Sequence, residues 1–307
     1  MDINNIAVIG GGMMGKAIAF VFSSQYQVGV YDVAPVDLAA GIRDITKELV
    51  AKGALPVTEL ENRLSRIRFI PAMGDEAIAG ADLVIEAVFE DMKLKQDTFV
   101  QLESICGEGC IFCTNTSVMS PSEISRDLVH RGRFAGTHFW NPAHLIPLVE
   151  VVMSDATSPR TAQVVMEALE KVGKKPVLCK KDVPGFVANR LQHALWREAI
   201  YMVENGIADA KTVDDACKYG PGLRWPVLGP MENSDLVGIE LTYNIHDYIL
   251  GALADNHEPS RLLREMLDRG ELGMKSGKGW QEWTKEQADG ISAGLREYLV
   301  DYYLERK

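Results

Sequence analysis

Short runs of β-branched and apolar residues alternate with longer segments of helical period through about residue 182 of this chain. The eight runs are IAVIG, QVGVYD, IRFI, DLVIEAV, CIFCTN, FAGTHFW, PLVEVVM and KPVLCK. Such alternation is typical of a largely parallel sheet covered by helices. This part of the chain is therefore predicted to be an α/β domain.

The pattern changes after Pro184. The segment FVANRLQHALWREAIYMVENG has apolar residues at helical spacing and ends in Asn205-Gly206, a helix stop signal. Thr212, followed three residues later by Asp215, resembles a capping box and predicts that the next helix begins there. A second, all-helical domain is predicted to follow the first.

The stretch VPGFVAN separates the two patterns. Its Pro and Gly do not continue a strand, and Pro suits the first turn of a helix, so we place the boundary near Val183. The predicted domains are residues 1–183 and 184–307.

Composition limits the class of protein. The 307 residues are 47% hydrophobic and 24% charged, which suits a soluble protein of two domains. There is no apolar run of membrane-span length, and MDINNIAVIG lacks the features of a secretory signal, so we expect a cytoplasmic protein without a membrane partner. A formal net charge of −11 argues against nucleic acid as a partner.

The five cysteines raise the question of a metal site. Cys106, Cys110 and Cys113 have a C-x3-C-x2-C spacing that suits an iron–sulfur cluster, but such a cluster needs a loop, and CIFCTNTS is strand-like. An odd number of cysteines also suits reduced thiols. We expect buried thiols and no metal.

The run IAVIGGGMMGKAIAF joins a strand-like segment to a helical one. Gly10, Gly12 and Gly15 fit G-x-G-x-x-G, whose glycines permit a tight turn, close approach to a pyrophosphate and close helix–strand packing. The next strand-like run ends at Asp32, where a carboxylate binds ribose hydroxyls and repels a 2′-phosphate. The sequence predicts a Rossmann-type doubly wound sheet that binds NAD.

The same glycines also match most of the phosphate-binding loop of nucleoside triphosphatases, up to Lys16. That loop needs a Ser or Thr after the lysine to bind magnesium, and Ala17 stands there. We therefore set this alternative aside.

The run THFWNPAHLIPLVEVV contains a candidate for proton transfer. Glu150 lies in an apolar strand-like segment, where an ionised carboxylate needs a cationic or N–H-donating partner. His138, at the end of the preceding strand-like segment, is the natural candidate. A carboxylate on one imidazole nitrogen leaves the other able to take a proton.

A Ser-His-acid hydrolase with Ser117, His138 and Glu150 is the alternative from another enzyme class. It needs a G-x-S-x-G turn or an equivalent, and TNTSVMS has no such glycines. The other histidines are expected to be structural: His130, His144, His193, His246 and His257.

A series of motifs occurs in the order seen in the L-3-hydroxyacyl-CoA dehydrogenase family, which the chain resembles over nearly its whole length. They are GGGMMG with Asp32, EAVFEDMKLK, TNTS, HFWNPAHLIPLVEVV, VPGFVANR and GMKSGKGW. The resemblance implies that residues 1–183 form an NAD-binding Rossmann domain and that residues 184–307 form a helical domain that binds substrate and forms a homodimer. It also implies NAD-dependent oxidation of a 3-hydroxyacyl group, as in fatty acid metabolism.

The resemblance assigns roles to individual residues. His138 would act as general base on the 3-hydroxyl, with Glu150 orienting the imidazole, while Ser117 and Asn189 would hydrogen-bond substrate oxygens. The residues that would line the cofactor site or hold the loop beside it are Ala87, Glu90, Lys95, Asn115 and Asn141. Taken alone, the spacing of Glu90 and Lys95 also suits an exposed ion pair on a helix.

Two substrate classes stay open. The segment GLRWPVLGP is longer than its counterpart in acyl-CoA members and resembles relatives that oxidise small free hydroxy acids, such as carnitine, gulonate and pyridine-carboxylate dehydrogenases. Arg224 suits a free carboxylate, and Trp225 suits the wall of a small pocket.

Four basic residues favour an acyl-CoA substrate, because their positions suit contact with CoA phosphates: Lys47, Lys52, Arg63 and Arg66. We expect 3-hydroxyacyl-CoA as the substrate because that activity is the commonest in the family. A small free hydroxy acid is the alternative. A catalytically silent NAD-binding protein is a third, against which the intact candidate residues argue.

Overall fold

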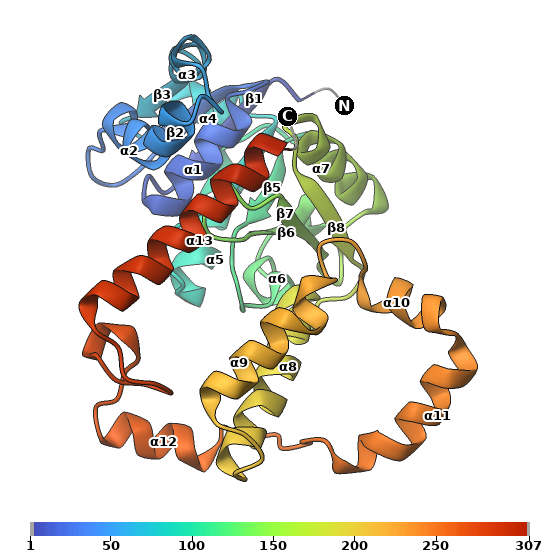
Figure 1. Ribbon diagram of the computed structural model, residues 1–307. Coiled ribbons are helices and arrows are strands. Elements are labelled where there is room, and N and C mark those ends of the chain that lie inside the picture. Colours follow the sequence, from blue (N-terminus) through green and yellow to red (C-terminus); the bar gives the residue numbers. More distant parts are fainter. Residues whose placement is uncertain (1–2, 306–307) are drawn as a thin grey trace. The chain divides into compact units, whose positions relative to one another are not determined.

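The computed structural model describes residues 3–305, and its first unit is built on one eight-stranded sheet (Figure 1). The strand order is β3-β2-β1-β4-β5-β6-β7-β8. The strands are β1 (Asn5–Ile9), β2 (Gln27–Tyr31), β3 (Ile67–Ile70), β4 (Leu83–Glu86), β5 (Ile111–Thr114), β6 (Phe134–Phe139), β7 (Leu148–Met153) and β8 (Lys175–Cys179). Seven of the eight predicted runs contain a whole strand, and IAVIG contains all of β1 except Asn5, so the predicted α/β class is confirmed.

The sheet is parallel from β3 to β6, whereas β7 pairs with β6 in the antiparallel direction and β8 runs parallel to β7. The strand order reverses beside β1, which lies between β2 and β4. In such doubly wound sheets the ligand binds outside the carboxyl ends of the strands at that reversal. The predicted Rossmann-type arrangement is thus confirmed.

Helices cover both faces of the sheet. Side chains of β1 alternate between the two layers: Ile6 and Val8 belong to the core under α1 and α7, and Ala7 and Ile9 to the core under α4, α5 and α6. The helices of this unit are α1 (Met13–Phe22), α2 (Leu38–Ala51), α3 (Val57–Leu64), α4 (Glu76–Ala79), α5 (Met92–Ile105), α6 (Pro121–Ile124) and α7 (Pro159–Lys171), with a 3₁₀ turn at Arg131–Arg133.

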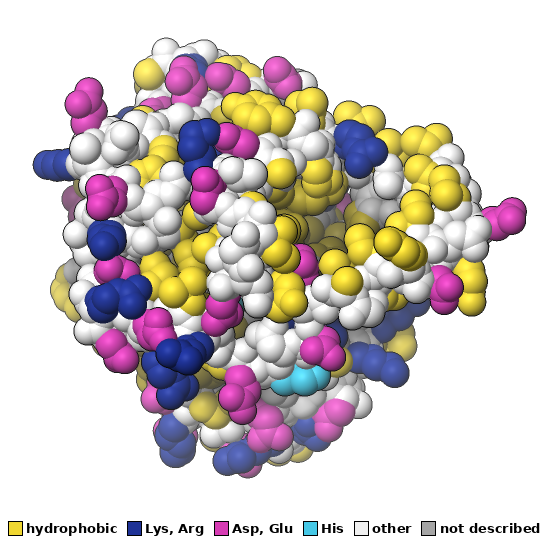
Figure 2. All heavy atoms as spheres, turned by 60° about the horizontal axis from the view of Figure 1, so that its bottom comes forward, with side chains coloured by type: hydrophobic (Ala, Val, Ile, Leu, Met, Phe, Trp, Pro, Cys, Tyr) yellow, Lys and Arg dark blue, Asp and Glu magenta, His cyan; other side chains and the backbone are white. Residues whose placement is uncertain are grey.

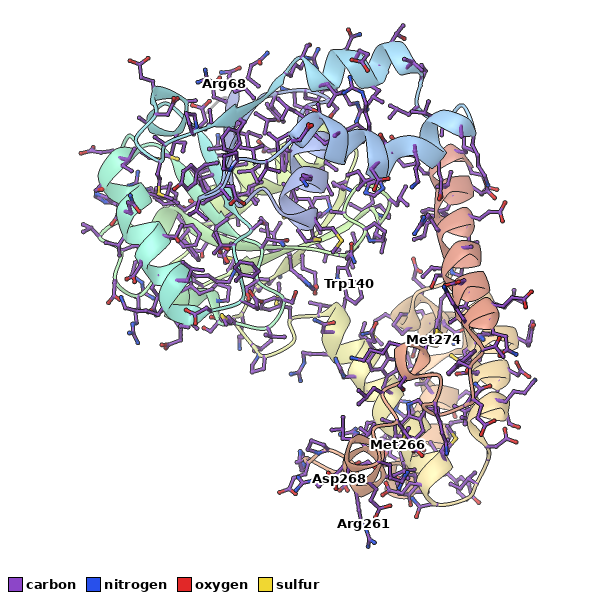
Figure 3. The ribbon with its side chains drawn as sticks, turned by 90° about the vertical axis from the view of Figure 1, so that its left-hand side faces the viewer. Arg68, Trp140, Arg261, Met266, Asp268 and Met274 are labelled. Carbon is purple, nitrogen blue, oxygen red and sulfur yellow. The ribbon has the colours of Figure 1, made fainter. Side chains whose placement is uncertain are left out.

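The remaining elements are helical, which confirms the predicted all-helical segment. They are α8 (Ala188–Glu204), α9 (Ala210–Tyr219), α10 (Pro230–Val237), α11 (Ile239–Ile249), α12 (Arg261–Asp268) and α13 (Lys285–Glu305), with 3₁₀ turns at Pro221–Leu223, Leu250–Ala252 and Met274–Ser276. Met266 of α12 is one of the few buried side chains here (Figure 3). Within residues 3–305 there is no helix whose length and apolar content would let it cross a membrane.

The chain divides into two compact units. One comprises Met1–Ala188 together with Arg296–Lys307, and the other comprises Asn189–Leu295, so the last part of α13 belongs with the sheet. The domain ranges predicted from the sequence, 1–183 and 184–307, stay a prediction.

The predicted start of the second long helix is wrong. Asp209, not Thr212, is the N-cap of α9, and its carboxylate accepts the backbone N–H of Thr212 at 2.7 Å. Both residues suit a cap, but an aspartate one turn earlier takes the position because its carboxylate reaches the unpaired N–H groups of the first turn. The stop at Asn205-Gly206 is confirmed, since α8 ends at Glu204.

The core under α5 generates a stability prediction. Phe99 is fully buried and packs edge-on against Phe134, with ring centroids 4.8 Å apart. Phe99→Ala should lower the free energy of unfolding in urea by about 3–5 kcal/mol, because it leaves a cavity. Phe89 is 86% exposed, and the matched change Phe89→Ala should alter it by less than about 0.5 kcal/mol. Equal losses in the two variants would contradict this assignment of the core.

Candidate active site

The glycine-rich turn has the backbone geometry that its sequence requires. Gly10 has a φ of +106°, and a Cβ there would lie 2.6 Å from the carbonyl oxygen of Ala87. A Cβ on Gly15 would lie 1.8 Å from the carbonyl oxygen of Gly10, so α1 can approach the turn only with glycine there. Ala87 thus contributes its backbone to the floor of this turn.

Gly12 and Asp32 are suited to contact with a cofactor, Gly12 by open space and Asp32 by an ordered carboxylate. A Cβ on Gly12 would meet no protein atom within 4 Å, which leaves the N-terminus of α1 open to an anion. Asp32 follows β2, and its carboxylate accepts the backbone N–H of Gly11 at 2.7 Å and that of Ala34 at 3.1 Å. This combination fits NAD: an open helix N-terminus for the pyrophosphate and an ordered carboxylate for the ribose.

His138 and Glu150 are brought together by strand register. They are direct partners in the antiparallel β6–β7 pair, so their side chains leave the same face of the sheet. Nδ1 of His138 lies 2.8 Å from Oε2 of Glu150, and both side chains are buried. Because β6 is parallel to β1, His138 stands near the same edge of the sheet as the glycine turn.

Glu150 is surrounded by donors. Its Oε1 accepts the backbone N–H groups of Val187 and Ala188, both at 2.8 Å, and its Oε2 also accepts the indole N–H of Trp140 at 3.2 Å (Figure 3). Burial alone would raise the pKa of this carboxyl, but the hydrogen bonds from His138 and these donors outweigh it and lower the pKa. The carboxylate is therefore held in its ionised form beside the imidazole.

Glu86 is a buried charge to which sequence reasoning gave no site role. This residue ends β4 and accepts hydrogen bonds from Lys95 Nζ at 2.7 Å and Thr114 Oγ1 at 2.6 Å. Burial raises its pKa, against the opposing effect of the Lys95 ammonium. The sequence did contain a signal for Glu86, because DLVIEAV places its carboxylate in an apolar run just as PLVEVVM places that of Glu150.

Lys95 and Glu90 belong to the same cluster, not to an exposed helical pair. Lys95 is buried on α5 and lies 3.0 Å from Glu90 Oε2 as well as beside Glu86. Glu90 in turn accepts the Thr116 hydroxyl at 2.6 Å and the Ser117 backbone N–H at 2.8 Å. The cluster therefore ties α5 to the segments after β4 and β5 at the carboxyl edge of the sheet.

Asn115 and Asn141 lie beside this edge. The side-chain oxygen of Asn115 accepts the backbone N–H of Phe139, which joins the end of β5 to the end of β6 next to His138. Asn141 follows β6 and forms a cis peptide bond with Pro142. The sheet unit thus gathers the predicted residues from Gly10 to Glu150 at its carboxyl edge, although Glu150 itself lies within β7.

Three predicted residues belong to the other unit. Asn189 begins it on α8, and Arg224 and Trp225 follow the 3₁₀ turn Pro221–Leu223 with largely exposed side chains. The roles expected for these three residues in binding substrate stay predictions.

The three cysteines with the C-x3-C-x2-C spacing, which were expected to be buried thiols, lie in the sheet unit. Cys106, Cys110 and Cys113 are buried, with Cys113 on β5, and burial raises the pKa of the Cys113 thiol to about 12. Over residues 3–305, no three His, Cys, Asp or Glu side chains are grouped closely enough to hold a metal ion.

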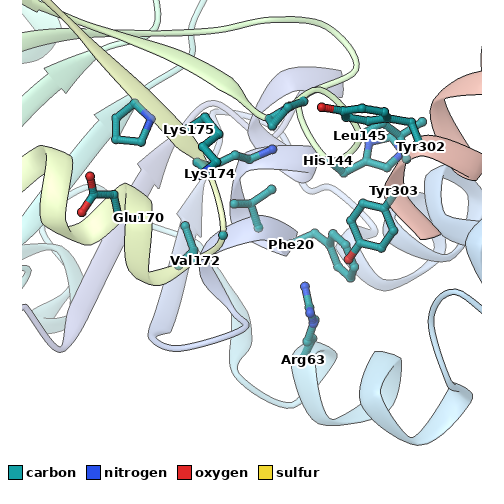
Figure 4. Close-up of a pocket in the computed structure, with 14 residues that line it drawn as sticks. Phe20, Arg63, His144, Leu145, Glu170, Val172, Lys174, Lys175, Tyr302 and Tyr303 are labelled. Carbon is teal, nitrogen blue, oxygen red and sulfur yellow. The ribbon is translucent and has the colours of Figure 1, made fainter. Parts of the chain in front are cut away.

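A cavity of about 650 Å³ lies elsewhere in the sheet unit (Figure 4). None of the predicted catalytic or cofactor-binding residues lines it, but Arg63, one of the residues expected to meet CoA phosphates, does. The buried Lys174 ammonium donates to the carbonyl oxygens of Ala143 and Ile146 there. His144 lines the same cavity, and burial together with the nearby Lys174 charge lowers the pKa of its imidazole to about 4. A neutral His144 agrees with the structural role expected for it.

Models of two protein domains match the chain: 3-hydroxyacyl-CoA dehydrogenase, NAD binding domain, over residues 5–183, and the C-terminal domain of the same enzyme over residues 185–283. The chain belongs to the 3-hydroxyacyl-CoA dehydrogenase family. Its members are NAD-dependent oxidoreductases that act on CH–OH groups, and this chain is an enzyme of that type with NAD as its cofactor.

Relatives in the family act on different substrates. One is 5-formyl-3-hydroxy-2-methylpyridine 4-carboxylate 5-dehydrogenase from Mesorhizobium japonicum, 32% identical over 97% of this chain and 96% of the relative. A crystal structure of a dehydrogenase with this substrate matches with a TM-score of 0.87 and 31% identity over 99% of both chains. The (S)-3-hydroxybutyryl-CoA dehydrogenase of Ralstonia eutropha matches with a TM-score of 0.77 and 29% identity over 92% of this chain and 100% of its own.

Asp32 generates a prediction about cofactor preference. Hydrogen bonds to a charged group contribute roughly 1.5–3 kcal/mol, so Asp32→Ala should lower kcat/KM for NAD about ten- to a hundredfold. It should lower kcat/KM for NADP less, because the repulsion of a 2′-phosphate is also removed. Steady-state kinetics with both cofactors measure the ratio, and Asp32→Asn, which keeps the shape, should give an intermediate value. An unchanged NAD-to-NADP ratio in both variants would be inconsistent with this role.

Proposed function

We propose that His138 is the general base in the oxidation of a substrate hydroxyl and that Glu150 is its positioning residue. The observation that supports this most directly is the 2.8 Å contact between Nδ1 of His138 and Oε2 of Glu150 near the edge of the sheet that binds NAD. A carboxylate on Nδ1 keeps the proton there, so Nε2 is left with the lone pair that takes the hydroxyl proton.

The surrounding residues support each part of this mechanism. As Nε2 takes the proton, the Glu150 carboxylate stabilises the imidazolium, while the N–H groups of Val187 and Ala188 hold that carboxylate in place. NAD, when bound, accepts the hydride that leaves the substrate carbon bearing this hydroxyl. Ser117 and Asn189 hydrogen-bond the substrate oxygens in this proposal, as the family resemblance implies.

Replacing the base tests the mechanism. His138→Gln should lower kcat about 10²- to 10⁴-fold, the usual contribution of a positioned general base, and leave the Kd of NADH unchanged. The matched variant His130→Gln changes an exposed histidine and should leave kcat unchanged. Stopped-flow turnover and NADH fluorescence titration measure the two quantities. If His138→Gln turns over as fast as the parent, His138 is not the base.

We propose a small free hydroxy acid as the substrate class. The basic residues expected to meet CoA phosphates are all engaged by the protein itself. Lys47 pairs with Asp44, and Lys52 with Glu297 and Asp301. Arg63 pairs with Glu59, and the Arg66 guanidinium donates to the carbonyl oxygens of Ser23 and Ser24.

The comparisons support the same class. The pyridine-carboxylate dehydrogenase structure matches this chain with a TM-score of 0.87, whereas the hydroxybutyryl-CoA dehydrogenase of Ralstonia eutropha reaches 0.77 and a 3-hydroxyacyl-CoA dehydrogenase of Archaeoglobus fulgidus reaches 0.70. Arg224 and Trp225, in the longer GLRWPVLGP segment, would then bind the free carboxylate and wall a small pocket.

A 3-hydroxyacyl-CoA, the substrate expected from the sequence, is the second candidate. It is favoured by the family as a whole and by relatives such as the Ralstonia eutropha enzyme, and it would place the protein in fatty acid metabolism. Both candidates use the same base and the same cofactor.

A substrate series separates the two classes. The formation of NADH should be followed with 3-hydroxybutyryl-CoA, free 3-hydroxybutyrate, L-carnitine, L-gulonate and a hydroxymethylpyridine carboxylate. We expect kcat/KM for at least one free acid to exceed that for the CoA thioester at least tenfold. Turnover confined to the CoA thioester would overturn the small-acid proposal and leave the His138 mechanism intact.

We further propose that the protein is a homodimer through its helical unit. Helices α8 to α11 contain no buried residue as the structure describes them, and hydrophobic side chains (yellow) reach the surface in Figure 2. Large exposed apolar patches mark interaction surfaces. Strongly exposed hydrophobic side chains on these helices include Tyr219 at 77%, Leu236 at 71%, Tyr243 at 68% and Tyr248 at 91%.

Charged substitutions test this dimer. The double variant Leu236→Glu/Tyr243→Glu should shift the molar mass in light scattering from that of a dimer toward that of a monomer, because two carboxylates per chain would be buried in the interface. Val129, 81% exposed in the sheet unit, supplies the control Val129→Glu, which should remain dimeric. A parent protein that is monomeric at micromolar concentration would contradict the proposal.

A further inference from the structure

Helix α13 lies outside the region that defines the family. The C-terminal family model ends at residue 283, and α13 spans Lys285–Glu305. Among solved structures, the pyridine-carboxylate dehydrogenase matches 99% of this chain and a 3-hydroxyacyl-CoA dehydrogenase of Archaeoglobus fulgidus matches 98%, whereas the hydroxybutyryl-CoA dehydrogenase of Ralstonia eutropha accounts for 92%. The helix therefore needs an explanation of its own.

The last part of α13 is anchored on α2 and α3 within the sheet unit. Val300 is 1% exposed and packs in one apolar cluster with Ile42 and Leu49 of α2 and Leu60 of α3. Burial of an aliphatic side chain of this size stabilises the contact by roughly 1.5–3 kcal/mol. The helix is thus seated on its neighbours, not merely adjacent to them.

Ion pairs also join α13 to α2. Lys52, at the end of α2, lies 2.6 Å from Asp301 and 3.2 Å from Glu297, and Arg296 lies 3.0 Å from Glu48. Both carboxylates raise the pKa of the Lys52 amine through hydrogen bonds and charge. Two carboxylates on one face of α13 therefore pair with Lys52, the lysine that the sequence analysis expected to bind CoA phosphates.

The helix also limits the space beside the candidate site. A cavity of about 340 Å³ is bounded by Arg296 and Val300 of α13, by α2, and by Met13 and Asn141 from the carboxyl edge of the sheet. This volume lies at the lower end of the range for small-molecule pockets. It suits a small acid better than the nucleotide and phosphates of CoA.

We propose that the C-terminal part of α13 is a specificity element that excludes CoA. Glu297 and Asp301 occupy Lys52 in place of CoA phosphates, and the packing of Val300 against Ile42 and Leu49 holds the helix on α2 beside that lysine. A CoA thioester must then break these ion pairs and meet two carboxylates, whereas a small acid is unaffected. The inference rests on the proposed small-acid function and names the residues that enforce it.

Binding of free coenzyme A tests the proposal without turnover. The variant Glu297→Gln/Asp301→Asn keeps the shape of both side chains and the Val300 contact but releases Lys52. In calorimetric titrations of the full-length protein with NAD at low ionic strength, it should bind coenzyme A about three- to tenfold more tightly than the parent, the range expected from losing two exposed ion pairs. The gain should disappear in 0.5 M NaCl, where charges are screened (roughly 3–5 Å Debye length).

Two further variants make the result specific. Glu286→Gln/Asp289→Asn removes the same charge from α13 at positions for which the structure of residues 3–305 shows no ion pair, and it should leave coenzyme A binding unchanged. Adding Lys52→Ala to the first variant should abolish the gain. Equal affinity in the parent and the released variant, or equal gains in both charge variants, would overturn the proposal.

The proposed function fails on a different measurement. If the parent enzyme prefers 3-hydroxybutyryl-CoA to every free acid, the small-acid function is wrong, whatever the titrations show. If the parent prefers a free acid and the released variant binds coenzyme A no better, the function stands and α13 is not the excluding element.

Discussion

One buried carboxylate organises the candidate active site. Glu150 is fully buried on β7 and accepts hydrogen bonds from four donors: the imidazole of His138, the indole of Trp140 and the backbone N–H groups of Val187 and Ala188. An unpaired charge in such a place would be strongly destabilising, so all four groups must hold their positions. The same interaction thus fixes β6 against β7, fixes the segment that leads into α8, and prepares the base.

Much of the fold follows from local patterns. The eight strands were predictable because each is a short apolar run between helical segments, and residues such as Gly10 and Gly15 have backbone geometry that excludes other side chains. The partnership of His138 and Glu150 was predictable for a related reason, since a carboxylate in an apolar strand requires a donor. What the sequence did not contain was the antiparallel register that places the two opposite each other.

Features that depend on contacts distant in sequence were missed. The Val187 and Ala188 donors are backbone groups and leave no mark in the sequence. Glu86 carried a signal equal to that of Glu150, but its partner Lys95, nine positions further along the chain, was assigned to the cofactor site or to an exposed pair with Glu90. Lys52 was interpreted as a site for phosphate because its partners, Glu297 and Asp301, lie some 250 positions further along the chain. Charge patterns predict ligands poorly when the protein supplies the counter-charge from a remote helix.

The central claim is that Glu150 keeps His138 in the tautomer with its proton on Nδ1. The most direct measurement is ¹⁵N NMR of the histidine ring nitrogens at a pH where the imidazole is neutral, with the His138 signals assigned by their absence in a His138→Gln sample. The account predicts a protonated Nδ1 and a non-protonated Nε2 for His138. A proton on Nε2 in the neutral ring would contradict it, because that nitrogen would then have no lone pair for the substrate proton.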